Sequence, residues 1–179
     1  LRRRLALAHR HMGASWPKRD RRTLLEAPEQ WLGPCLEGCL SWKDLDEGSL
    51  QEALWGDLSW SQRQDLNRLL PLRLSIPSGR EARLRYEEDD VVLAVKLQEM
   101  FGCQDGPTVL DNRLAVTVEL LSPAGRPLQR TRDLGGFWRG SYSDVRREMR
   151  GRYPKHPWPD NPLEATATAY TKHRPVTRK

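Results

Sequence analysis

The spacing at which apolar residues recur changes at Pro71, and this change constrains the fold more than any other feature of the sequence. Before Pro71 the apolar residues recur at helical spacing. After it, Leu72, Leu74 and Ile76 alternate with polar residues, which is the period of a half-buried strand. Helical and strand patterns are thus segregated along the chain instead of alternating strictly.

Segregated patterns of this kind predict an α+β fold. We expect an N-terminal all-helical subdomain over residues 1–70 and, over residues 71–152, a mixed unit of antiparallel hairpins and helices. Residues 153–179 contain five prolines and little apolar content, which favours an extended Pro-rich strap followed by a flexible basic tail.

The helical segment carries several start and stop signals. Residues 2–12 favour a basic helix, and residues 23–36 favour a helix that Pro28 divides or restarts. The strings "SLQE" and "SWSQ" each place a serine three residues before Glu or Gln. Both match the capping box, so we expect Ser49 and Ser59 to be helix N-caps.

The mixed segment begins with a hairpin whose turn is "PSG" at 77–79. Val91 to Phe101 is predicted to be a helix closed by a glycine. Strands follow within residues 109–129, separated by Asp-Asn and Pro-Ala-Gly turns. A last helix is expected from Ser141 to Arg150, with Tyr142, Val145 and Met149 on the face that meets the core.

Charge is distributed unevenly. Residues 1–22 contain eight basic and one acidic group, residues 23–121 nine and eighteen, and residues 122–179 thirteen and five, which together give the net charge of +6. The basic ends suit an anionic partner, and they equally suit attraction to the acidic middle within the fold. Both readings stay open at this point.

Cysteine content and hydropathy bear on the compartment. Three cysteines leave one unpaired in any disulfide scheme, which favours a reducing environment. The apolar runs are too short to span a bilayer, and no signal peptide is recognisable. We expect a soluble, cytoplasmic chain without a membrane partner. Because the sequence starts at Leu1 inside a helical pattern, we also expect it to be part of a longer polypeptide.

No motif in the sequence indicates catalysis. A phosphate loop ending in Lys-Ser or Lys-Thr is lacking, and the Gly135-Gly136 pair is read as a bend. Cys35 and Cys39 have a spacing that zinc ligands use, but without a second tight pair they are read as free thiols. The acidic run "EEDD" at 87–90 is read as a solvated loop. We assign no catalytic residue and no metal ligand.

The C-terminal region is the candidate nucleic-acid-binding site. Basic side chains interleaved with aromatic rings suit phosphates and bases. The candidates for phosphate contacts are Arg139, Arg146, Arg147, Arg150, Arg152 and Lys155. The candidates for base stacking are Tyr153, His156 and Trp158. An alternative is that Trp158 and Tyr153 pin the strap onto the domain while the arginines pair with acidic side chains.

Three stretches resemble a known family: "LLSPAGRPLQ" at 120–129, "DLGGFWRGSY" at 133–142 and "VRREMRGRYPKHPWPDNPL" at 145–163. They closely resemble the C-terminal region of the HrpB family of bacterial DEAH-box ATP-dependent helicases. The resemblance continues more loosely upstream over nearly the whole chain. Asn161 departs from it, because an acidic residue is expected there.

The resemblance implies a parent polypeptide that hydrolyses ATP with Mg²⁺ to remodel RNA or another nucleic acid. No position in the 179 residues matches the ATPase motifs, so this part alone is expected to be inactive and to need no cofactor. The expected role is an accessory domain that binds RNA or single-stranded nucleic acid beside the motor.

The alternative role is a regulatory or protein-interaction module that docks on the helicase core or on an external partner. Large aromatic side chains that exceed what the first 70 residues can bury would anchor such an interface. The tryptophans concerned are Trp16, Trp31, Trp42, Trp55 and Trp60.

Overall fold

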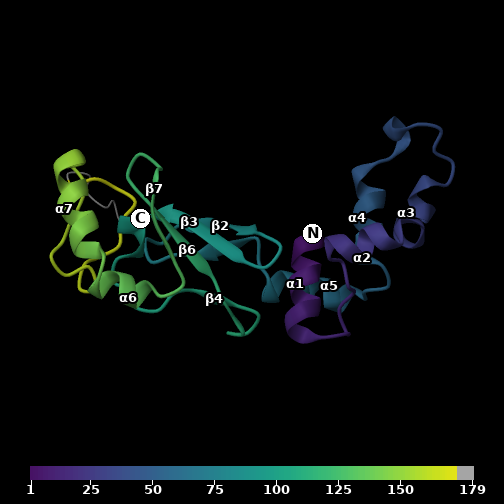
Figure 1. The fold of residues 1–179 in the computed structure, drawn as a ribbon, viewed down its shortest axis with the longest axis horizontal. Helices are drawn as coiled ribbons and strands as arrows, with labels where there is room; N and C mark the ends of the chain where they lie inside the picture. The colour runs from purple at the N-terminus through teal and green to yellow at the C-terminus, as the bar shows by residue number, and fades with distance from the viewer. Residues whose placement is uncertain (173–179) are drawn as a thin grey trace. The chain divides into compact units, whose positions relative to one another are not determined.

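The computed structural model describes residues 1–172 and divides into two compact units. One unit comprises residues 1–71 together with 86–89, and the other comprises residues 72–85 together with the chain from Asp90 onward. The first unit is helical, and the second combines a sheet with helices, so the α+β fold class is confirmed (Figure 1). The division into three segments stays a prediction.

The helical unit contains α1 (Arg2–Met12), α2 (Arg21–Glu26), α3 (Pro28–Leu36), a short 3-10 turn (Trp42–Asp44), α4 (Glu47–Trp55) and α5 (Trp60–Leu69). The predicted break at Pro28 is confirmed, because this proline is the first residue of α3. Ser59 caps α5 in a capping box with Gln62, as predicted. The prediction for Ser49 is wrong. Asp46 is the N-cap of α4, and its carboxylate accepts a hydrogen bond from the Ser49 backbone N–H at 3.0 Å.

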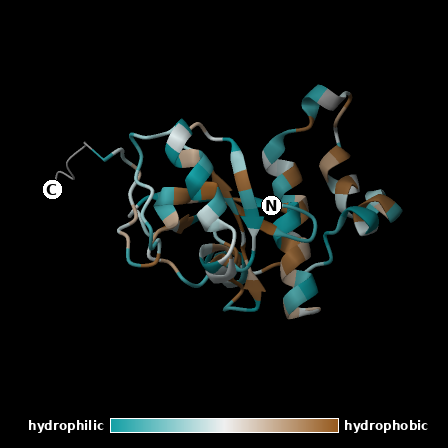
Figure 2. Ribbon diagram, turned by 60° about the vertical axis from the view of Figure 1, so that its left-hand side comes forward, coloured by the Kyte–Doolittle hydropathy of each residue, from teal (hydrophilic) through white to brown (hydrophobic). Residues whose placement is uncertain are grey.

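The core of the helical unit forms where α1 meets α5. Leu5, Leu7 and Leu66 are completely buried. Figure 2 shows hydrophobic and hydrophilic residues mixed along the helices, as half-buried helices require. Arg4 is buried among them. Its guanidinium donates to the carbonyl of Leu66 at 3.1 Å, which also accepts the backbone N–H of Leu70. It donates as well to the carbonyl of Leu70 at 2.7 Å, at the end of α5 where carbonyls have no intrahelical donor.

The acidic run at 87–90 is not simply solvated, contrary to the expectation from its composition. Arg2 forms an ion pair with Glu88, and Arg10 forms one with Asp89. Asp90 accepts hydrogen bonds within the second unit. Of the two readings of the charge pattern, attraction between a basic end and the acidic middle is therefore present within the fold.

The second unit contains a five-stranded sheet in the order β1-β2-β3-β6-β7. Its elements are β1 (Arg73–Ser75), β2 (Glu81–Tyr86), β3 (Val91–Lys96), a 3-10 turn (Leu97–Met100), β6 (Thr117–Leu121), β7 (Pro127–Thr131), α6 (Leu134–Arg139) and α7 (Tyr142–Arg152), with β4 (Thr108–Val109) and β5 (Leu114–Ala115) forming a separate small hairpin. The predicted hairpin of β1 and β2 is confirmed, with Leu74 opposite Ala82. Its turn ends at Gly79, whose φ of +79° favours glycine.

The predicted helix from Val91 to Phe101 is wrong. Residues 91–96 form β3, which is buried on both faces and pairs in parallel with β6, Val92 lying opposite Thr117. The sheet is thus mixed and not built from antiparallel hairpins alone. A strand buried on both faces has no alternation to reveal it, and only its β-branched residues favoured a strand.

An aromatic cluster connects the sheet to the last two helices. The ring centroids of Phe101 and Trp138 lie 6.0 Å apart, and those of Trp138 and Tyr142 lie 5.4 Å apart. The pair Gly135-Gly136 is not a bend but lies within α6. Asp133 caps this helix by accepting a hydrogen bond from the Gly136 N–H at 2.7 Å. No helix within residues 1–172 has the length and apolar character needed to cross a membrane.

Candidate nucleic-acid interface

Helix α7 presents a buried face to the aromatic cluster and a charged face to solvent. Tyr142 and Met149 are both 2% exposed, as predicted for the inner face, and burial raises the pKa of the Tyr142 hydroxyl. On the outer face the side chain of Arg147 is 80% exposed. Arg150 is also exposed and has no hydrogen-bond or ion-pair partner among residues 1–172.

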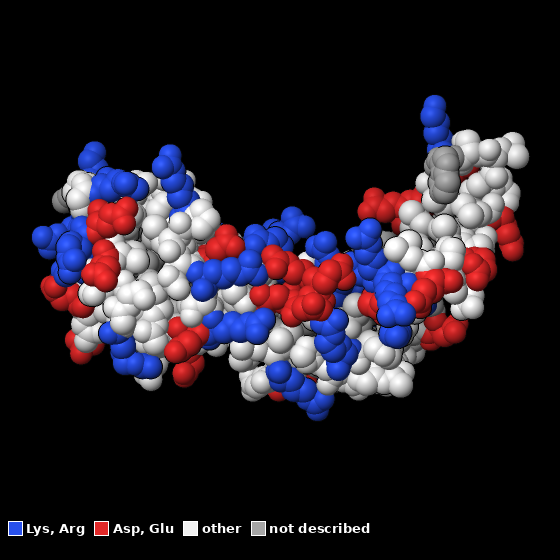
Figure 3. Space-filling view, in the orientation of Figure 1, with Lys and Arg blue, Asp and Glu red and all other residues white. Residues whose placement is uncertain are grey.

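Acidic side chains on α7 neutralise part of this charge. Arg147 lies 3.3 Å from Asp144, and Arg152 lies 3.5 Å from Glu148, both at spacings of three or four residues on an exposed helix surface. Such pairs contribute little and release their arginines readily to a stronger partner. Figure 3 shows the Lys and Arg side chains gathered around α7, with the carboxylates interspersed among them.

Arg146 does not belong to this outer face, although its position in the sequence suggested that it did. Its side chain is only 22% exposed. The Nε atom donates to the carbonyl of Trp158 at 2.9 Å, and Nη2 lies 2.5 Å from a carboxylate oxygen of Asp160. Arg146 is therefore a tether between α7 and the strap.

Trp158 and His156 are also engaged by the fold. Trp158 is 6% exposed, and its indole N–H donates to the carbonyl of Tyr153 at 2.9 Å. Its ring offers no open face to a base, and the alternative role of pinning the strap describes it better. His156 is half-buried, with Nδ1 at 2.7 Å from Oε1 of Gln98. Burial, reinforced by the Lys96 charge, lowers the pKa of its imidazole.

Gln98 is the residue that sequence reasoning missed in this region. Its side chain is buried, and its amide nitrogen donates to the carbonyls of Thr168 at 2.9 Å and Tyr170 at 2.8 Å. These two bonds fix the orientation of the amide, so the oxygen that faces His156 accepts the imidazole N–H. Residues 163–172 are therefore fastened to the domain, contrary to the expected flexible tail. Residues 173–179 of that tail lie outside the described part of the chain.

Tyr153 borders a small hollow between α7 and the β6–β7 turn. The cavity measures about 270 Å³, and Val145 and Met149 contribute apolar surface to it. The guanidinium-bearing side chains of Arg126 and Arg152 also line it. Its size suits a single ring system better than a drug-sized ligand. An aromatic ring, apolar contacts and two arginines are the groups that stack on a base and hold its phosphate.

Arg139 and Lys155 complete the set of predicted contacts. Both residues are exposed, Arg139 at the end of α6 and Lys155 in the strap. The structure thus leaves Arg139, Arg147, Arg150, Arg152 and Lys155 open to solvent and places Tyr153 beside a hollow. Arg146, His156 and Trp158 instead hold the strap against the domain.

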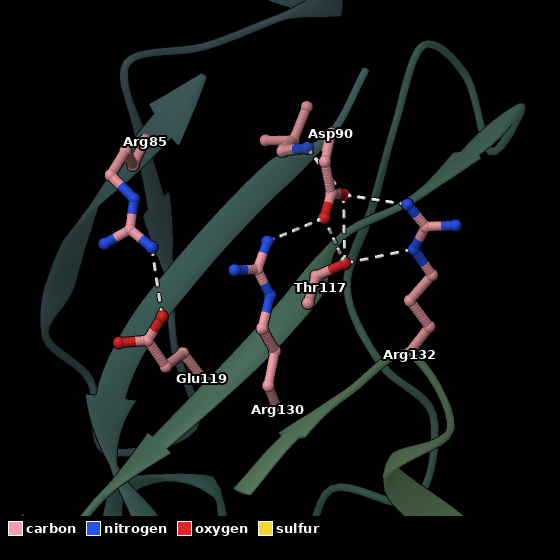
Figure 4. Close-up of polar contacts among 7 residues, drawn as sticks. Arg85, Asp90, Thr117, Glu119, Arg130 and Arg132 are labelled. Atoms are coloured by element: carbon pink, nitrogen blue, oxygen red, sulfur yellow. Dashed lines mark hydrogen bonds and ion pairs between the residues drawn. The ribbon is translucent and has the colours of Figure 1, made fainter. Parts of the chain in front are cut away.

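A second group of arginines lies on the exposed face of the sheet. Asp90 accepts hydrogen bonds from Arg130 at 3.1 Å and Arg132 at 3.0 Å (Figure 4). On the neighbouring strands Arg85 lies 3.0 Å from Glu119. Two carboxylates thus offset three guanidiniums here, so this face is a weaker candidate for a polyanion than α7. In the sequence, only the alternation of β2, which puts Arg85 on the exposed face, indicated this group of arginines.

The family resemblance assigns ATP and Mg²⁺ to the parent polypeptide. In residues 1–172 no group of three or more His, Cys, Asp or Glu side chains is placed to hold a metal ion. All three cysteines are free and half-buried.

Comparison with known proteins identifies the family. The family model described as "ATP-dependent helicase C-terminal" matches residues 31–162, which defines the class as the C-terminal region of an ATP-dependent helicase. The chain is 46% identical over 158 residues to the ATP-dependent RNA helicase HrpB of Escherichia coli K12, covering 88% of the chain and 20% of that protein. The chain belongs to the HrpB family.

Two crystal structures of E. coli HrpB match the fold. One, described as a DExH-box NTPase, has a TM-score of 0.80 and 44% identity over 93% of the chain. The other, described as a DEAH/RHA helicase, has a TM-score of 0.64 and 43% identity over 88% of the chain. The chain spans about a fifth of the length of these relatives.

Proposed function

We propose that this chain is a helicase accessory domain that contacts single-stranded nucleic acid, RNA first of all, through the outer face of α7. The observation that carries the proposal is the exposure of Arg147 and Arg150 on a helix whose opposite face is fixed by Tyr142 and Met149. The helix backbone is already fixed, so binding costs less conformational entropy than it would on a mobile segment. The E. coli relative is named as an RNA helicase.

The charge contribution is tested by the dependence of RNA affinity on salt. Each phosphate that a protein neutralises on a single strand contributes a slope of about 0.7 in log K against log salt. We expect the double variant Arg147→Gln/Arg150→Gln to lower the slope by roughly 1.4 with a fluorescent oligouridine probe. The matched control is Arg21→Gln/Arg22→Gln, which removes the same charge from exposed positions of α2. An equal fall in slope for both double variants contradicts the proposed surface.

The base contribution is tested separately at Tyr153. Stacking on an aromatic side chain contributes about 1–3 kcal/mol per base, so Tyr153→Leu should weaken oligouridine binding by roughly 5-fold to 150-fold while leaving the salt slope unchanged. Tyr153→Phe should bind normally. An abasic oligomer, which keeps the phosphates, should bind the wild type and the Leu variant equally. A loss of affinity for the abasic oligomer would show that Tyr153 acts only through the strap.

A protein-interaction role is the second candidate, and the helical unit supports it. Leu25, Leu40 and Trp60 are 67%, 98% and 76% exposed, which is unusual for large apolar side chains. Trp16 is buried and Trp55 packs under Arg63 at 5.3 Å, so not every tryptophan is available. The side chain of Trp42 lies outside the described structure. Regulation of a helicase core would change the RNA-stimulated ATPase rate of a HrpB-type helicase when this region is deleted.

A further inference from the structure

The helical unit contains a groove of about 890 Å³ among α2, α3 and α4. Its volume lies in the upper part of the range of functional pockets and is ample for several side chains. The nucleic-acid-binding surface proposed above does not use it. Its lining divides into an apolar floor and an acidic rim.

The floor is held in shape by hydrogen bonds of the groove's own residues. The Trp31 indole N–H donates to the carbonyl of Leu24 at 3.0 Å, which fixes the ring at the floor. Leu24 is buried, and Ala53 adds apolar surface from α4. Cys35 and Cys39 also line the groove as free, half-buried thiols. A preformed apolar floor of this kind suits the hydrophobic side chains of a docked helix.

The rim carries carboxylates whose charge is stabilised. Asp44 accepts hydrogen bonds from the Leu40 and Ser41 backbone N–H groups, and Asp46 accepts one from Ser49. These donors lower the pKa of both carboxyl groups. Glu37 and Asp57 also line the groove. Arg19 lies there as well, but its Nε donates to the carbonyl of Leu54.

We propose that this groove is the docking site for a basic amphipathic helix of a partner protein. The acidic rim complements Lys and Arg side chains flanking an apolar stripe, whereas it repels the phosphates of RNA. A second copy of the described residues offers no suitable helix. The two basic helices α1 and α7 already bury their apolar residues in their own units.

The direct test uses designed 18-residue peptides labelled with fluorescein. One contains Lys with Leu at helical spacing, the second has the same composition in shuffled order, and the third has Glu in place of every Lys. We expect fluorescence anisotropy to show at least tenfold tighter binding of the first peptide than of either control. Equal binding of the ordered and shuffled peptides would mean that the surface attracts positive charge without providing a groove.

The location of the peptide is tested through the cysteines. With the peptide at ten times its Kd, alkylation of Cys35 and Cys39 by N-ethylmaleimide should slow about tenfold. Cys103, in the other unit, should react at an unchanged rate and is the internal control. Unchanged alkylation of Cys35 and Cys39 under bound conditions overturns the proposed site.

Two substitutions complete the test. Ala53→Phe, which fills the floor, should weaken peptide binding at least tenfold, and Glu37→Gln should weaken it severalfold. The matched control Glu29→Gln removes an exposed carboxylate outside the groove lining and should have little effect. All variants should keep the RNA affinity of the wild type, which separates this proposal from that for α7. Peptide binding that Ala53→Phe leaves intact contradicts docking in the groove.

Discussion

Replacing Arg146 by Met should loosen the strap without removing a phosphate contact. The substitution keeps the apolar stem and removes the guanidinium that joins α7 to Trp158 and Asp160. A hydrogen bond from a charged donor contributes about 1.5–3 kcal/mol. The ion pair adds little because Asp160 is 90% exposed. We therefore expect the free energy of strap opening to fall by about 2 kcal/mol, which corresponds to a roughly 30-fold larger open population.

The indole N–H of Trp158 reports this opening directly because it donates to the carbonyl of Tyr153 within the strap. Hydrogen exchange followed by NMR should accelerate about 30-fold at this proton in Arg146→Met. The indole N–H of Trp138, which donates to the carbonyl of Cys103 at 2.7 Å, is the internal reference and should not change. Asp160→Asn should accelerate exchange less than about fivefold, since it removes only the exposed ion pair.

The same variant distinguishes a tether from a phosphate contact. As a tether, Arg146 contributes to the order of the strap and leaves the salt slope of RNA binding unchanged, whereas Arg147→Gln lowers that slope. The reasoning is refuted if Arg146→Met lowers the slope as much as Arg147→Gln does and leaves exchange at Trp158 unaffected.

Three further predictions concern the strap and the helical core. Burial lowers the pKa of His156 below the unfolded value of 6.5, so the docked strap favours the neutral imidazole. Docking is therefore fully stable above pH 6.5 and weakens as the pH falls below it. Proteolysis of the strap should be faster at pH 5.5 than at pH 7.5, and His156→Gln should abolish this difference. Gln98→Leu removes two donors and one acceptor, so amide exchange at Thr168 should rise about 30-fold, for a loss of about 2 kcal/mol. Arg4→Met removes the buried guanidinium that donates to the Leu70 carbonyl at the end of α5 and should lower the free energy of unfolding in urea by about 2–3 kcal/mol, of which Arg4→Lys recovers only part.

Features fixed by residues close in sequence could be predicted from the sequence. Pro28 begins α3, and Ser59 caps α5, because a proline ring or a side-chain oxygen acts within one helical turn. The β1–β2 hairpin was also predictable, since one sheet face is solvated and the residues alternate. Asp46 was missed as the cap of α4 because Asp46 and Ser49 are both suitable N-cap residues. Starting at Asp46 lengthens the helix by three residues, most of one turn.

Features that depend on distant residues were not predictable. β3 is buried on both faces, so its sequence carries no periodicity that separates a strand from a buried helix. Gln98 fastens the strap only because the fold brings the carbonyls of residues 168 and 170, about 70 positions further along the chain, next to its side chain. Nothing in the residues around Gln98 indicates those partners.

The candidate interface shows why composition identified the region and not the role of each arginine. Arg146 and Arg150 lie one turn apart on α7 with the same chemistry and helix propensity. The path of the strap brings the carbonyl of Trp158 within 2.9 Å of Arg146, while Arg150 faces solvent. The carbonyl needs a donor once Trp158 is buried, so the nearest guanidinium serves the fold and the next one stays available. The arginines that orient α7 and those that meet a polyanion are therefore separated by the course of the strap, and single substitutions at the two positions should have different readouts.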